Sequence, residues 1–162
     1  LFRSGKVGLY YGLEDWIDYD MILRFKGRIS GVSSNDGEKI PTAEKLFLGG
    51  LGSVRGYSPY SISPLYDPND PYSRRVGGKY SASSSVEASI PLSEAAKMRL
   101  AFFYDYGMIG EDSFDEIKRS STGAMIEWQS MFGPINLVFA KPIDEEPGDD
   151  TASFEFSMGS RF

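Results

Sequence analysis

Hydrophobic and polar residues alternate with a period of two along most of the chain. In the segment 79–90, for example, Val86 and Ala88 alternate with Glu87 and Ser89. Successive side chains of a β-strand point to opposite faces of a sheet, so this period predicts strands. The same pattern predicts seven strands in all, at residues 5–13, 19–31, 79–90, 98–109, 122–132, 135–143 and 151–162. The sequence therefore predicts an all-β fold.

The predicted strands have the length and the two faces of membrane-spanning strands. They are roughly nine to thirteen residues long, whereas strands of globular sheets usually have five or six. One face is apolar and aromatic, and the other carries mainly Ser, Gly and charged residues, which suits a narrow wet lumen. The pattern favours an antiparallel transmembrane β-barrel over a soluble β-sandwich or a lipocalin-like barrel. Aromatic residues near the predicted strand ends would form its interfacial belt: Tyr10, Tyr11, Tyr104, Tyr106, Trp128 and Phe162.

The predicted connections alternate between short and long. Those after the first, third and fifth strands are short, and the longest connection, residues 32–78, follows the second strand. In outer-membrane barrels the short turns are periplasmic and the long loops are extracellular. We therefore expect residues 32–78 to form an extracellular loop and the C-terminus to be periplasmic.

Composition narrows the chemistry that the chain can perform. Its 162 residues include no Cys and no His, and 23 acidic against 17 basic residues give a net charge of −6. The missing residue types exclude thiolate nucleophiles, Cys/His zinc sites and Ser-His-Asp triads. We expect no enzymatic activity, no metal and no cofactor. Nucleic acid is not an expected partner either, because phosphate binding needs clustered Lys and Arg.

The long predicted loop contains a Gly-rich stretch around one Arg. Glycines on both sides of Arg55 let the backbone lie close to a wall. Glu87 and Asp105 lie on the polar faces of two neighbouring predicted strands, and a lumenal Arg needs such partners because an unpaired charge there is costly. These residues suggest a loop that folds back into the lumen and is latched by Arg55 to Glu87 and Asp105. The alternative is a flexible surface loop with a solvated Arg.

Three other charged clusters support less specific interpretations. Arg24, Lys26 and Arg28 form a basic stripe that could meet a translocating chain or, by our preferred interpretation, balance lumenal carboxylates. The segment 67–71 could be a calcium ligand set, but an ordinary turn fits better because no Glu follows at the required offset. The acidic segment 144–150 is predicted to be a solvated outer loop. The lumenal carboxylates are Glu87, Asp105, Glu127 and Glu155.

Several motifs resemble the C-terminal barrel region of the BamA-type outer-membrane assembly superfamily, also called the bacterial surface antigen superfamily. The resemblance covers residues 45–162 well and the first two strands by pattern only. Its most specific motif is Val54-Arg55-Gly56-Tyr57, which follows Gly49-Gly50. The other matching stretches are VGG at 76–78, VEASIP at 86–91, FFYDYG at 102–107, WQSMFGP at 128–134 and FEFSMGSRF at 154–162.

The resemblance implies a structural role for particular residues. In that superfamily the motif loop enters the barrel, where its Arg pairs with acidic residues of the adjoining strands; the matching residues here are Arg55, Glu87 and Asp105. The final strand is one lip of a seam at which client strands add by β-augmentation. The residues that match that final strand are Phe154, Phe156, Met158, Gly159 and Phe162.

The resemblance also implies the larger architecture. Seven strands are an odd number and fewer than the usual minimum of about eight for a barrel. We therefore expect residues 1–162 to be the C-terminal portion of one transmembrane barrel domain, which has about 16 strands in the full-length protein.

The function implied by the resemblance is the assembly and insertion of β-barrel proteins into the bacterial outer membrane. The implied partners are unfolded outer-membrane proteins, outer-membrane lipid, and periplasmic assembly lipoproteins bound through upstream POTRA domains. The last motif position is Phe in much of the superfamily and Tyr57 here. That difference leaves a TamA-like or two-partner-secretion translocation barrel as an alternative. A passive porin or transport barrel is the alternative from another class.

Overall fold

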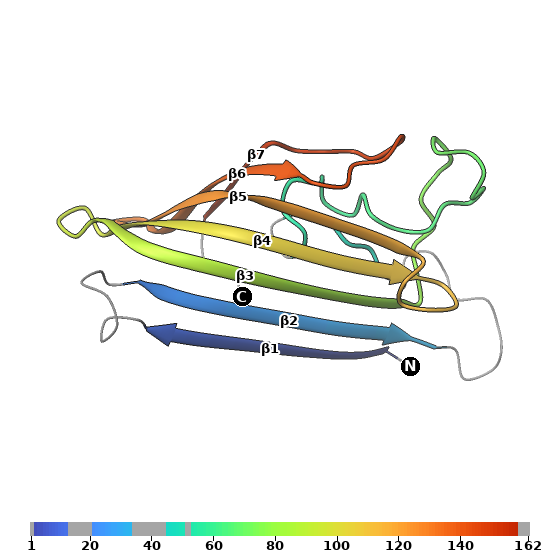
Figure 1. Ribbon diagram of the computed structural model, residues 1–162, viewed down its shortest axis with the longest axis horizontal. Coiled ribbons are helices and arrows are strands. Elements are labelled where there is room, and N and C mark those ends of the chain that lie inside the picture. The colour runs from blue at the N-terminus through green and yellow to red at the C-terminus, as the bar shows by residue number, and fades with distance from the viewer. Residues whose placement is uncertain (1, 13–20, 34–44, 51–52, 159–162) are drawn as a thin grey trace.

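Seven strands form a single antiparallel sheet in which each strand pairs with the next one along the chain (Figure 1). The computed structural model describes residues 2–12, 21–33, 45–50 and 53–158. The strands are β1 (Phe2–Gly12), β2 (Ile22–Val32), β3 (Tyr80–Ser93), β4 (Met98–Gly110), β5 (Ile117–Ser130), β6 (Gly133–Pro142) and β7 (Phe154–Met158). The all-β prediction with seven antiparallel strands is therefore confirmed. Within the described residues, no helix is long and apolar enough to cross a membrane.

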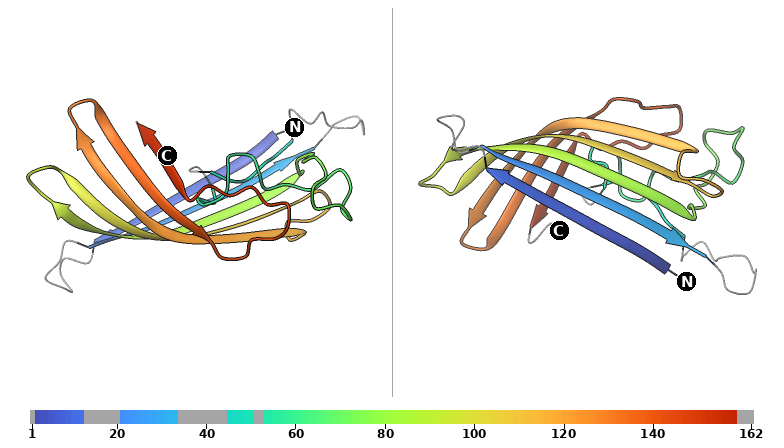
Figure 2. Two further views of the ribbon diagram at one scale, coloured as in Figure 1. Left: turned by 90° about the horizontal axis from the view of Figure 1, so that it is seen from above. Right: turned by 60° about the horizontal axis from the view of Figure 1, so that its bottom comes forward.

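The sheet is curved, and the described part of the long β2–β3 connection lies on its concave side (Figure 2). The alternating pattern sorts the side chains between the two faces. On the convex face Phe102, Phe139 and Phe154 are each about half exposed, at 51–53%. On the concave face Glu87 and Asp105 are fully buried. An apolar outer face and a polar inner face are what a barrel wall in a membrane requires.

Part of the concave face is drier than the expected wet lumen. A cluster of buried apolar side chains lies there, on three adjacent strands. Phe103 of β4 and Met125 of β5 are its largest members, and both are almost completely shielded from solvent. The Gly-rich motif of the β2–β3 connection covers part of this area, because the guanidinium carbon of Arg55 lies 3.8 Å from the centroid of the Phe103 ring. Its members are Ala101, Phe103, Met125, Val138 and Ala140.

Six of the seven strands begin at positions other than those predicted, and two of these differences have a clear cause. β5 begins at Ile117 rather than at 122, because the polar run 118–121 hides the alternation although these residues pair with β4. β7 begins at Phe154 rather than at 151, because Thr151 forms a β-bridge with Tyr57 of the motif. Of the residues predicted for the terminal strand, Gly159 and Phe162 lie outside the described residues.

Candidate functional site: the motif loop on the concave face

Short antiparallel pairings give the β2–β3 connection a defined path. We call its described residues, 45–50 and 53–78, the motif loop. Leu46 and Gly78 exchange two backbone hydrogen bonds of 2.9 Å, and Leu48 and Ile62 do the same. These pairings satisfy backbone groups that would otherwise be buried without partners. The loop is thereby anchored next to the start of β3.

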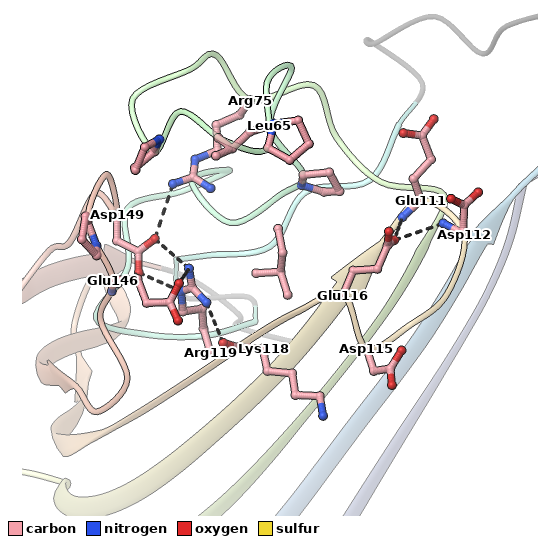
Figure 3. A pocket seen from close by; sticks show the side chains of 15 residues that line it. Leu65, Arg75, Glu111, Asp112, Asp115, Glu116, Lys118, Arg119, Glu146 and Asp149 are labelled. Atoms are coloured by element: carbon pink, nitrogen blue, oxygen red, sulfur yellow. Dashed lines mark hydrogen bonds and ion pairs between the residues drawn. The ribbon is translucent and has the colours of Figure 1, made fainter.

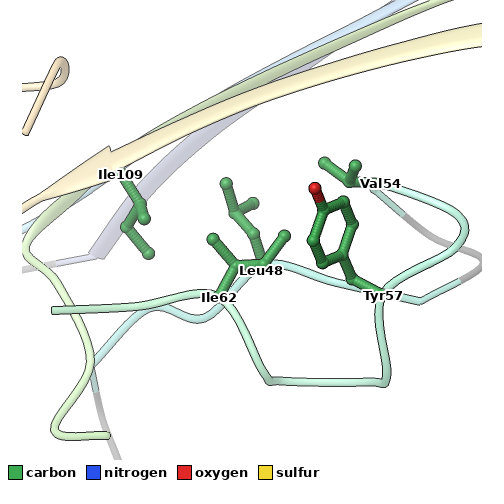
Figure 4. Packing of buried hydrophobic residues seen from close by; sticks show 5 residues of the cluster. All are labelled: Leu48, Val54, Tyr57, Ile62 and Ile109. Atoms are coloured by element: carbon green, nitrogen blue, oxygen red, sulfur yellow. The ribbon is translucent and has the colours of Figure 1, made fainter. Parts of the chain in front are cut away.

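Apolar side chains of the motif loop pack on β4 (Figure 4). Val54 and Tyr57 are fully buried, and Leu48 and Ile62 lie beside them over Ile109 of β4. Burying an aliphatic side chain of this size contributes about 1.5–3 kcal/mol. The cluster therefore contributes to holding the loop on the sheet, in addition to the contribution of charged contacts.

Arg55 lies at the centre of the contact between the motif loop and the sheet, with 2% of its surface exposed. Its Nη1 lies 2.6 Å from Oε1 of Glu87. Its Nε and Nη2 donate hydrogen bonds of 2.7 Å to the two carboxylate oxygens of Asp105, and its backbone N–H donates to the same carboxylate at 3.0 Å. Nη2 also donates to Ser85 at 2.8 Å, and the guanidinium carbon lies 3.8 Å from the ring centroid of Phe103.

The register of β3 and β4 explains how two strands supply these partners. Ser85 pairs with Asp105, and Glu87 pairs with Phe103, so the four side chains occupy two neighbouring cross-strand pairs on the same face of the ladder. Their odd positions place all of them on the concave face. The sheet thus presents two carboxylates, one hydroxyl and one ring to a single guanidinium.

The opposing charges keep Arg55 ionised despite its burial. Burial by itself lowers the pKa of the guanidinium, but the hydrogen bonds and charge of Asp105, together with the charge of Glu87, outweigh it and raise the pKa above its ordinary value. Planar bidentate pairing of Arg with a carboxylate is among the stronger hydrogen-bonding arrangements in proteins. Arg55 therefore stays charged at every physiological pH.

Glu87 is also the partner of the basic stripe on β2. Arg24 Nη1 lies 3.3 Å from Glu87 Oε2, and Lys26 Nζ lies 3.4 Å from Oε1. Arg24 reaches Glu127 of β5 as well. One fully buried carboxylate thus lies among three cations, which agrees with our interpretation of the stripe as a balance for lumenal carboxylates.

Comparison with known proteins decides the family. Residues 3–162 match the Omp85 superfamily domain. The chain belongs to the Omp85 superfamily. Its fold agrees with a crystal structure of BamA from Haemophilus ducreyi that lacks POTRA domains 1–3, with a TM-score of 0.83 and 23% sequence identity. That likeness covers 96% of this chain and 34% of the BamA chain. The predicted fold class, an all-β sheet that corresponds to part of a β-barrel, is therefore confirmed.

The curated relatives of this Omp85 chain include three proteins named outer membrane protein assembly factor BamA. The protein of Nitratidesulfovibrio vulgaris is 30% identical over 148 residues, which cover 87% of this chain and 18% of that protein. The protein of Neisseria meningitidis serogroup B is 28% identical over 158 residues, which cover 77% of this chain and 19% of that protein. The protein of Neorickettsia risticii is 27% identical over 160 residues, which cover 93% of this chain and 21% of that protein. The chain spans about a fifth of the length of these relatives.

The hydroxyl of Tyr57 makes hydrogen-bond contacts in this Omp85 domain. The hydroxyl donates to Asp144 Oδ1 at 3.2 Å and lies 3.4 Å from the carbonyl oxygen of Ser120. Burial, and next the neighbouring carboxylate of Asp144, raise the pKa of Tyr57 above its ordinary value. The phenol therefore remains a proton donor, which gives the Tyr at this position a contact that a Phe could not make.

The acidic segment after β6 is only partly the solvated loop that its composition predicts: Glu145, Glu146 and Asp150 are exposed, whereas Asp149 is shielded. Asp149 has 4% of its side chain exposed and accepts two hydrogen bonds, of 2.7 and 3.1 Å, from Arg119 of β5 (Figure 3). Arg75 of the motif loop lies 3.4 Å from the same carboxylate. These residues form one side of a cavity of about 870 Å³. Arg119 is the basic residue in the sequence that could have indicated a partner for Asp149. The polar run 118–121 concealed the strand that places it there.

Gly107 provides a test of the apolar contact. A Cβ at this position would lie 2.6 Å from Cγ2 of Val54, so Gly107→Ala should displace the Val54 side chain from its packed position. We expect a loss of about 1–3 kcal/mol in unfolding free energy, measured by urea unfolding of the full-length protein in lipid vesicles. Gly27→Ala in β2 is the matched control, because a Cβ there meets nothing within 4 Å. Equal unfolding midpoints for the two variants would contradict the packing described.

Proposed function

We propose that this chain is the C-terminal part of an outer-membrane barrel that assembles and inserts other β-barrel proteins. The observation that carries the proposal is the match of almost the whole chain to the Omp85 domain, together with three curated relatives that are all named assembly factors. The proposed barrel has about 16 strands in the full-length protein, of which residues 1–162 supply about seven. Its proposed partners are unfolded outer-membrane proteins, outer-membrane lipid and, through POTRA domains, periplasmic lipoproteins.

The edge of β7 is the proposed site of client addition. Within the described residues β7 pairs with a strand on one side only, through the register Phe139↔Phe154 to Ile135↔Met158. An unpaired edge offers backbone N–H and C=O groups to an incoming strand, which can add by β-augmentation. The outward position of Phe154, Phe156 and Met158, each more than half exposed, suits contact with lipid. In this arrangement the C-terminus is periplasmic.

The motif loop is the proposed latch of the barrel. Arg55, flanked by Val54, Gly56 and Tyr57, would hold the loop on the concave face through Glu87 and Asp105. A loop held in this way leaves the long-loop end of the barrel with a fixed shape while strands move at the seam. The proposed function consists of strand exchange and therefore requires no bond-making step and no cofactor.

Reconstitution tests this proposal against the porin alternative. The full-length protein that contains this chain, placed in lipid vesicles, should accelerate the folding of an unfolded outer-membrane protein, which is followed by its resistance to protease. Empty vesicles give the uncatalysed rate, and ion conductance is measured on the same preparation. High conductance without acceleration would identify a passive pore and would overturn the proposal.

A further inference from the structure

The connection between β6 and β7 pairs with the motif loop before it enters the terminal strand. We call this connection, residues 143–153, the strap. The backbone N–H of Ser58 donates to the carbonyl of Asp150, and that of Ala152 donates to the carbonyl of Gly56, both at 2.9 Å. Thr151 and Tyr57 form the bridge between these two hydrogen bonds. The motif loop thus acts as a neighbouring strand for the residues just before β7.

Side chains fasten the strap at a second point. Asp149, whose side chain is 4% exposed, receives two hydrogen bonds from Arg119 of β5. Arg75 of the motif loop donates to the carbonyl of Gly148 at 3.0 Å and contacts Asp149 at 3.4 Å. A single strap carboxylate is therefore bound from the sheet on one side and from the motif loop on the other (Figure 3).

The strap continues directly into the terminal strand. Ser153 accepts a backbone hydrogen bond of 3.0 Å from Ala140 of β6, and Phe154 then begins the β6–β7 ladder. Gly56, next to the latching Arg55, accepts its hydrogen bond from Ala152, which lies two residues before the start of β7.

We propose that the strap couples the motif loop to the terminal strand, and that Asp149 is the positioning residue that fixes where β7 begins. Arg119 and Arg75 hold Asp149, Asp149 holds the strap against residues 56–58, and the strap sets the position of β7 on β6. A change in the motif loop then reaches the edge of β7 through hydrogen bonds. The consequence for client addition rests on the proposed function, whereas the coupling itself does not.

Hydrogen exchange in the full-length protein in lipid vesicles measures the coupling. Asp149→Asn removes the charge that Arg119 and Arg75 share, so the backbone amides of residues 154–158 should exchange about tenfold faster. Exchange in the β3–β4 ladder should not change, because that ladder does not depend on the strap. Asp150→Asn is the matched control: it removes the same charge one residue away, from an exposed side chain. Unchanged exchange at 154–158 in Asp149→Asn would overturn the proposal.

A disulfide distinguishes positioning from a general loss of folding. Ser58 and Asp150 are directly opposite in the loop–strap pairing, at a separation that a disulfide can bridge, and the chain has no Cys of its own. Oxidation of Ser58→Cys/Asp150→Cys in the Asp149→Asn background should return exchange at 154–158 to the original rate, and reduction should reverse the rescue. A formed disulfide without rescue would overturn the coupling. If the protein does not fold clients at all, the proposed function fails while these exchange rates still decide the role of the strap.

Discussion

Replacing Arg55 with Ala should release the motif loop from the concave face and destabilise the domain by about 3–5 kcal/mol. The substitution leaves Glu87 and Asp105, both fully buried, without the guanidinium that compensates their charge. It also removes the cation that stacks on Phe103. Limited proteolysis of the full-length protein in lipid vesicles should show faster cleavage within residues 45–78, and client folding should slow in parallel.

Arg55→Lys is the matched control for charge. Lys keeps the positive charge but lacks the planar fork, so it cannot bind both oxygens of Asp105 while also reaching Glu87. We expect an intermediate rate of loop cleavage for this variant. A cleavage rate in Arg55→Ala equal to that of the original protein would show that the apolar cluster alone holds the loop.

Replacing Glu87 with Gln should have the second-largest effect. Glu87 is the fully buried carboxylate that contacts Arg24, Lys26 and Arg55, so its neutralisation leaves cations of β2 and of the motif loop close together with less compensating charge. Breaking one side of a buried ion pair costs about 3–5 kcal/mol, and the remaining carboxylates Asp105 and Glu127 should reduce the loss toward the lower end of this range. Urea unfolding in lipid vesicles measures it.

Glu127→Gln controls for the loss of one lumenal charge. Glu127 also contacts Arg24, but its side chain is 24% exposed, so solvent screens its charge. We expect its unfolding midpoint to shift by less than half as much as that of Glu87→Gln. Similar shifts for both variants would mean that net lumenal charge matters rather than the position of Glu87.

Periodicity predicted the seven strands approximately and offered Glu87 and Asp105 as candidate partners of Arg55, and the resemblance of the motif favoured that pairing. Apolar and polar residues alternate along most of β3 and β4, so the face of each residue follows from its position, and the polar faces of these two strands contain few acidic residues. Glu87 and Asp105 are therefore the candidate partners that the sequence offers, and the structure brings both to Arg55. The role of this contact as a latch remains a proposal.

The contacts that periodicity could not predict depend on the register between strands and on the path of the loops. Phe103 and Ser85 touch the guanidinium because of the register between β3 and β4, which alternation alone does not define. The sequence predicted an acidic loop at residues 144–150 and a strand from residue 151, because it does not reveal that residues 56–58 lie beside the strap. Its Asp149 was predicted to be solvated for the same reason: the partner, Arg119, lies in a polar run that showed no strand pattern.

The position of the Arg55 guanidinium in the full-length protein tests the account most directly. Electron cryomicroscopy of that protein in a lipid bilayer, at a resolution that separates side chains, would locate it relative to the sheet. We expect the guanidinium to contact both Glu87 and Asp105 at hydrogen-bond distance, with residues 150–152 paired to residues 56–58. A motif loop outside the concave face, with Arg55 in solvent, would contradict this expectation.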